Sequence, residues 1–118
     1  GAHVIILSGE GYSLIWPEGQ PIRKYDWHEG SMVVPPDNWW HQHFNTGREP
    51  ARYLALRAFG SKKHRGVGKP YRGATDRKKG GEQIGYEEEE PTVRRLFEEA
   101  LARHGTKSQM ARYYERNP

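Results

Sequence analysis

Residues 30–45 read GSMVVPPDNWWHQHFN and hold the two histidines around which the rest of the chain can be interpreted. A short apolar run ends at a double proline, and an Asp-Asn pair, typical of turns, follows it. The next stretch, 40–45, is expected to be a strand. Because side chains alternate along a strand, His41, His43 and Asn45 should share one face. Two imidazoles on one face are the start of a metal site, which usually needs three or four ligands.

The composition fits a single domain of 118 residues whose apolar side chains are concentrated in residues 4–59. The net charge of +4 is modest and unevenly placed, so nucleic acid is not an expected partner. The absence of cysteine excludes disulfide scaffolds and thiolate metal sites, and it is compatible with a reducing, cytoplasmic location. No apolar run approaches membrane-spanning length, and no membrane partner is expected.

Alternating apolar segments separated by Gly- and Pro-containing turns predict six short strands. They are expected at residues 3–7, 12–16, 22–27, 31–34, 41–45 and 51–59. The first two strands, joined by Ser-Gly-Glu-Gly, are predicted to pair as a hairpin. Short strands at this spacing predict an antiparallel sandwich or barrel.

The second half of the chain has a different composition. Residues 60–90 are basic and rich in glycine, which favours a solvated linker or loop, with a patch for phosphate, nucleic acid or an acidic partner as the alternative. Residues 91–118 are predicted to form a helical extension. Its first helix carries apolar residues at helical spacing and ends at Gly105, a suitable C-cap, and a second short helix is expected at 107–116. Both helices are expected to cover a sheet face or a partner chain.

The opening stretch resembles the second motif of the cupin superfamily, G-x5-P-x-G-x2-H-x3-N, with Asn38 at the second glycine. Asparagine tolerates the left-handed conformation that a turn glycine serves, so this departure is mild. Residues 5–12, IILSGEGY, are similar to the end of the first cupin motif. The resemblance covers residues 3–57. It implies a mainly β fold, a small antiparallel jelly-roll β-barrel at 1–59, which often holds one divalent metal.

The resemblance also implies a ligand set, two His and one Glu from the first motif and one His from the second. The second-motif ligand corresponds to His41. The first-motif ligands precede the hairpin, so the barrel is expected to be incomplete at its N-terminal end. His3 lies close to the position of the family's Glu, one residue out of register, and is the second candidate ligand. Another part of the protein supplies the remaining ligands, another subunit supplies them, or the barrel works without metal.

Two classes of function follow from the resemblance. The first is a metal-dependent, dioxygenase-like oxidoreductase acting on a small organic or aromatic acid, with Fe(II) favoured over Mn, Ni or Zn. In it His41 binds the metal, and His43 and Tyr12 are the candidate catalytic residues that handle protons. Tyr53 is a further candidate for lining a pocket, although packing alone would explain both tyrosines. The second class is a non-catalytic cupin that binds a small molecule or serves as an oligomerisation module.

Six strands are few for a closed barrel, so exposed sheet edges are expected. A homodimer, or a second chain that completes the barrel, is therefore the predicted assembly.

Overall fold

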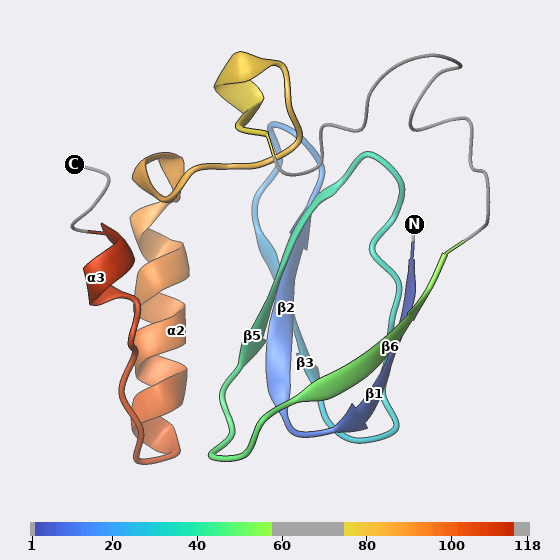
Figure 1. The fold of residues 1–118 in the computed structure, drawn as a ribbon, viewed down its shortest axis with the longest axis vertical. Coiled ribbons are helices and arrows are strands. Elements are labelled where there is room, and N and C mark those ends of the chain that lie inside the picture. Colours follow the sequence, from blue (N-terminus) through green and yellow to red (C-terminus); the bar gives the residue numbers. More distant parts are fainter. Residues whose placement is uncertain (1, 58–74, 115–118) are drawn as a thin grey trace.

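The computed structural model describes residues 2–57 and 75–114, and it contains two three-stranded antiparallel sheets with a helix packed on one of them (Figure 1). All six predicted strands are confirmed. They are β1 His3–Ser8, β2 Gly11–Trp16, β3 Arg23–Trp27, β4 Met32–Val33, β5 Trp40–Asn45 and β6 Arg52–Leu56. The strand order is β4-β1-β6 in one sheet, here the β1 sheet, and β3-β2-β5 in the other, here the β2 sheet. The mainly β fold is thus confirmed, and the described strands form no closed barrel.

The predicted hairpin between the first two strands is wrong, because β1 and β2 belong to different sheets. The turn between them crosses from one sheet to the other. Gly9 has a φ of +96°, and a Cβ built there would lie 2.7 Å from Ala51 Cα. The carbonyl of Glu10 accepts hydrogen bonds from the N–H groups of Thr46 and Gly47 at 3.1 and 3.3 Å. Contacts with the distant β5–β6 turn therefore fix this crossing, where only glycine tolerates the backbone conformation.

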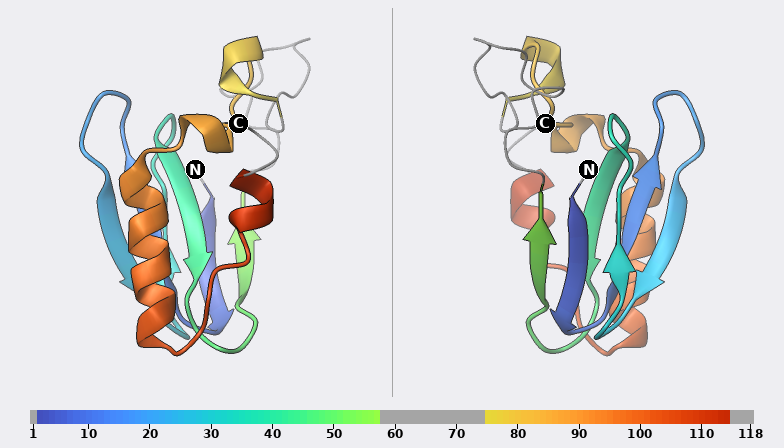
Figure 2. Two further views of the ribbon diagram at one scale, coloured as in Figure 1. Left: turned by 90° about the vertical axis from the view of Figure 1, so that its left-hand side faces the viewer. Right: turned by 90° about the vertical axis from the view of Figure 1, so that its right-hand side faces the viewer.

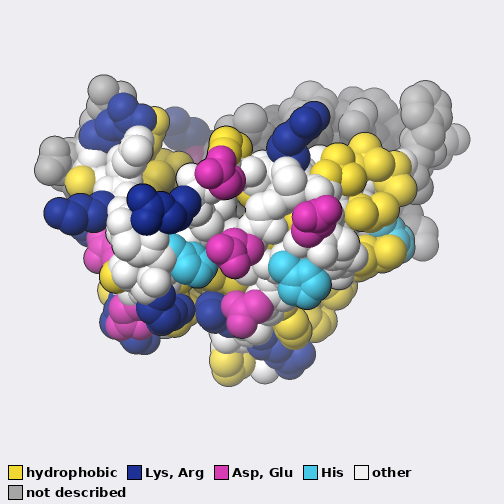
Figure 3. All heavy atoms as spheres, turned by 90° about the horizontal axis from the view of Figure 1, so that it is seen from below, with side chains coloured by type: hydrophobic (Ala, Val, Ile, Leu, Met, Phe, Trp, Pro, Cys, Tyr) yellow, Lys and Arg dark blue, Asp and Glu magenta, His cyan; other side chains and the backbone are white. Residues whose placement is uncertain are grey.

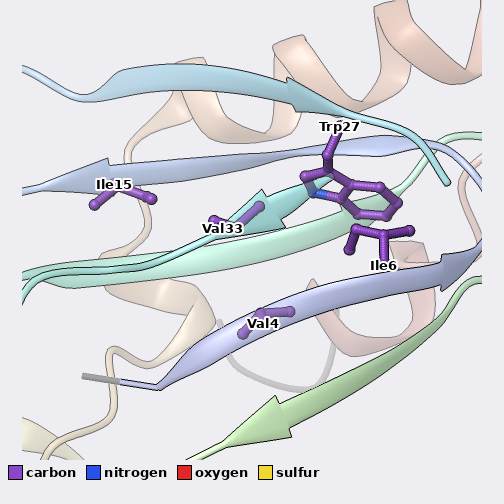
Figure 4. Packing of buried hydrophobic residues seen from close by; sticks show 5 residues of the cluster. All are labelled: Val4, Ile6, Ile15, Trp27 and Val33. Atoms are coloured by element: carbon purple, nitrogen blue, oxygen red, sulfur yellow. The ribbon is translucent and has the colours of Figure 1, made fainter. Parts of the chain in front are cut away.

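The crossing lets the two sheets bury their facing sides against each other. Val4, Ile6 and Val33 from the β1 sheet pack with Ile15 and Trp27 from the β2 sheet (Figure 4). Burial of apolar area is the dominant favourable term in folding, and a hairpin in one flat sheet would leave these side chains without a second layer. We call the facing sides of the two sheets their inner faces.

The outer face of the β2 sheet is covered by helix α2, Pro91–Arg103 (Figures 1 and 2). Val93 and Ala100 of the helix form a buried cluster with Tyr12 and Leu14 of β2. The helix predicted from apolar spacing is confirmed, as is its role as a cover for a sheet face. It ends as expected at Gly105, whose φ is +70°. The N–H groups of Gly105 and Thr106 donate to the Ala102 and Leu101 carbonyls at 3.1 and 3.0 Å, which satisfies helix-end acceptors.

The segment predicted to be a linker, 60–90, is described only from residue 75, and its part at 60–74 lies outside the described residues, as do residues 58 and 59 at the end of the sixth predicted strand. Residues 75–90 contain two single-turn helices, Arg77–Lys79 and Tyr86–Glu88. Ion pairs join these two turns, with Arg77 Nε 3.0 Å from Glu88 and Lys78 Nζ 2.8 Å from Glu87.

The second predicted helix appears as one turn, α3 Ala111–Tyr114, whose two tyrosine rings contact Tyr86. Within the described ranges, no helix combines the length and apolar character needed to cross a bilayer.

Candidate functional site

The two histidines lie on the inner face of the β2 sheet. In the β2–β5 register Ser13 is opposite His43 and Ile15 is opposite His41, whereas Tyr12 is opposite Phe44. Ile15 belongs to the core between the sheets, so the histidines beside it share the inner face. The predicted common face of His41, His43 and Asn45 is therefore confirmed.

A short hydrogen-bonded chain connects Trp27, Ser13 and His43. The Trp27 indole N–H donates to Ser13 Oγ at 3.0 Å, and Ser13 Oγ lies 2.7 Å from His43 Nδ1. Ser13 is fully buried. An indole nitrogen only donates, so Ser13 accepts from Trp27. A hydroxyl donates one hydrogen bond and accepts two, so Ser13 can pair with either tautomer of a neutral His43, by donating to a bare Nδ1 or by accepting from Nδ1–H.

Both imidazoles are neutral near pH 7. Burial lowers the pKa of His43 to about 4, and the neighbouring His41 contributes to that shift. Burial also lowers the pKa of His41, and the positive charge of Arg57 acts in the same direction. The two ring centroids are 5.3 Å apart, with His43 half-buried and His41 nearer the open side. Each ring therefore offers one N–H donor and one acceptor nitrogen instead of a charge.

Strand β6 closes the site from the β1 sheet. Tyr53 is opposite Ile6, a core residue, so its ring lies on the inner face, 5.8 Å from the His43 ring centroid. Arg57 follows the strand and lies close enough to lower the pKa of His41. We call Ser13, His41, His43, Tyr53 and Arg57 the inter-sheet site.

Sequence reasoning proposed Tyr53 as a pocket residue but missed Ser13 and Arg57. The usable signal was the polar Ser13 between apolar neighbours in β2. It pointed to this site only once the pairing of β2 with β5 was known.

Tyr12, the second candidate catalytic residue, lies on the opposite face from His43. Its ring stacks on Phe44 with centroids 4.9 Å apart, in the cluster beneath α2. The residue is 1% exposed, and its hydroxyl has no hydrogen-bond partner. Burial raises the pKa of this hydroxyl above its usual range. The alternation of side chains along β2 thus separates Tyr12 from the inter-sheet site, and a proton-handling role beside His43 does not fit its position.

His3 and His41, the two candidate metal ligands, are not brought together. Val4 faces the core, so His3, its exposed neighbour in β1, projects from the outer face of the β1 sheet. In residues 2–57 and 75–114, no three His, Cys, Asp or Glu side chains lie close enough to hold a metal ion. His41 and His43 supply two imidazoles, and one of these is already hydrogen-bonded to Ser13. The described residues alone therefore do not fit the divalent metal that the cupin resemblance implies.

An open cavity of about 350 Å³ lies away from the histidines, between one end of the β2 sheet and residues 77–93. Three of its four carboxylates are already engaged within the chain. Glu18 accepts from the Trp40 indole, Glu88 pairs with Arg77, and Glu89 accepts from Gln42 at 2.9 Å. The Gln42–Glu89 contact fastens residues 77–90 to the sheet, and a structural role accounts for it.

Comparison with protein-family models, curated proteins and solved structures gave no match for this chain.

Proposed function

We propose that this chain is a non-catalytic, cupin-like module that binds a small organic or aromatic acid in the inter-sheet site. One observation carries the proposal: two neutral imidazoles and a phenol lie on the inner faces of the two sheets beside an apolar core, and the exposed Arg57 lies near enough to His41 to lower its pKa. The register places no Asp or Glu among the inner-face residues of the six described strands. The side chains there thus favour an anion that also carries apolar surface.

The geometry assigns different parts of the ligand to different residues. A carboxylate is best placed against Arg57, since a guanidinium matches its two oxygens. In the tautomer with its proton on Nε2, neutral His43 is a second donor for that group, and the Tyr53 hydroxyl is a third. The apolar part of the ligand would contact the ring of Trp27, which is held in place by Ser13. This mixture of apolar wall and few polar groups is typical of small-molecule sites.

A second candidate function is the metal-dependent, dioxygenase-like enzyme. It is favoured by the two neutral imidazoles on one strand, because unprotonated imidazole nitrogens are good ligands for Fe(II), Mn, Ni and Zn. His41 would be the ligand from this chain. Further ligands would have to come from outside the described residues, for example from a partner chain, so we derive no reaction step through a metal.

Calorimetric titration with benzoate at pH 7 tests the first proposal. Benzoate should bind saturably to the whole chain, and Arg57→Gln should weaken binding on the order of 10-fold or more, since a hydrogen bond to a charged group is lost. Arg95→Gln is the matched control, because Arg95 is an exposed arginine on α2. Unchanged affinity in Arg57→Gln, or equal losses in both variants, would argue against the site.

A further inference from the structure

The outer face of the β1 sheet is apolar and exposed. Val4 faces the core and pairs with Val33 and Ala55, so the residues on either side of these three face outward. The outward set from the three strands comprises Ile5, Leu7, Met32, Val34, Leu54 and Leu56. Leu7, Met32, Val34, Leu54 and Leu56 are exposed by 50, 60, 42, 47 and 51%. Hydrophobic side chains gather on the side of the molecule that holds β1 and β6 (right in Figure 3).

No described element covers this face. Helix α2 packs against the other sheet, α3 contacts Tyr86, and every residue of β6 is exposed. The segment that follows β6, residues 58–74, has a basic and glycine-rich sequence with few large apolar side chains. Its composition is a poor match for an apolar sheet face, which leaves another molecule as the better occupant.

The apolar area of this face is similar to the apolar area that one partner contributes to a standard dimer interface. At these exposed fractions its side chains present on the order of 400–500 Å² of apolar surface, which equals the largest patches on monomers, and such patches are often functional. A standard interface covers about 800 Å² on each partner, and roughly 60% of that area is apolar. The apolar surface present here is therefore what one side of such an interface requires.

We propose that a second copy of this chain packs against this face, so that two β1 sheets stack across a two-fold axis. An apolar surface without central charges is complementary to itself, as a two-fold interface requires. The polar members of the face lie at its ends, since His3 is opposite Leu56 and Arg52 is opposite Ser8. This gives an apolar centre and a polar rim, the usual anatomy of an interface. Tyr53 and the inter-sheet site lie on the other face of β6. A negative result for the dimer therefore leaves the ligand site untouched, and a negative result for the ligand site leaves the dimer untouched.

Light scattering on the whole chain, coupled to size-exclusion chromatography, tests this interface. The unmodified chain should have the mass of a dimer. The double variant Leu54→Glu with Leu56→Glu should be a monomer, because like charges facing each other across the axis weaken association on the order of 100-fold or more. Ala102→Glu is the control on α2, where one added carboxylate is exposed and remote from the interface, and it should remain a dimer.

A second measurement needs no variant at the interface. In a mixture of two differently isotope-labelled samples, NOEs between copies should connect the methyl groups of Leu54, Leu56 and Met32. A monomeric unmodified chain, a dimer that persists in the double variant, or NOEs between copies confined to other surfaces would each overturn the proposal.

Discussion

Ser13 Oγ lies 2.7 Å from His43 Nδ1, and the same oxygen accepts the indole N–H of Trp27. One buried hydroxyl therefore contacts the histidine and holds the tryptophan ring that faces the β1 sheet. Side chains from three predicted strands, β2, β3 and β5, meet at this atom. These two contacts explain why β2 carries a serine among apolar residues.

Ser13→Ala should destabilise the chain by about 1–3 kcal/mol, because the Trp27 indole N–H and His43 Nδ1 both lose their partner in a buried setting. Urea unfolding followed by circular dichroism measures this loss. The double-mutant cycle with Trp27→Phe is the control, since the second change removes the orphaned donor. The two losses should then be clearly less than additive. Strict additivity would mean that the hydrogen bond between Trp27 and Ser13 contributes little.

Stability should fall in acid because of His43. Its pKa is lowered from 6.5 to about 4 in the folded chain, so between these values the unfolded chain binds more protons. The contribution of His43 to the free energy of unfolding is therefore fully present above about pH 6.5. It is lost as the pH falls toward 4, and the loss is about 2–3 kcal/mol in total. His41, whose pKa is also lowered, acts in the same direction. Urea midpoints measured from pH 7.5 to 4.5 give the slope.

His43→Gln should flatten that pH dependence, and the same change at the exposed His28 should leave it intact. A slope that is equally steep in His43→Gln would show that other groups cause the loss of stability in acid.

Tyr12→Phe should leave stability unchanged or raise it by up to about 1 kcal/mol, because the substitution removes a buried hydroxyl that has no partner. Benzoate binding should not change, since Tyr12 lies on the face beneath α2. Thermal unfolding and calorimetry measure the two effects. Tyr53→Phe is the comparison, and it should weaken binding severalfold. A large loss of binding in Tyr12→Phe would restore the proton-handling role that the sequence indicated for this residue.

Metal analysis separates the two candidate functions. The binding module should contain Fe, Mn, Ni and Zn far below one equivalent, and a chelator should leave its melting temperature unchanged. One equivalent of metal that is lost in His41→Ala but retained in His28→Ala would instead establish the metal-dependent candidate. It would also require ligands beyond the described residues.

The fold was predictable where the signal is local. Alternating apolar residues and Gly-Pro turns predict each strand, and the apolar spacing with Gly105 at its end predicts α2. The common face of His41 and His43 follows from strand geometry alone.

The pairing of strands depends on contacts between distant residues and was not predictable in the same way. The Ser8-to-Gly11 turn is compatible with a hairpin, and it is the approach of Ala51 and Thr46 that turns it into a crossing. Because the strand pairing was not known, Tyr12 was predicted to act together with His43. Side chains alternate along β2, and Tyr12 therefore lies on the opposite face of the sheet from His43. Ser13 and His43 are 30 residues apart in sequence, so their contact could not be inferred without the register.

Benzoate binding in the inter-sheet site can be observed in the imidazole ¹H–¹⁵N spectrum of the whole chain, recorded at pH 7 during a titration with benzoate. We expect a neutral His43 with its proton on Nε2 in the free chain. We also expect saturable shifts of the His41 and His43 signals, with His28 and His104 unaffected. A protonated His43 at pH 7, or benzoate shifts that spare His41 and His43, would contradict the proposed site.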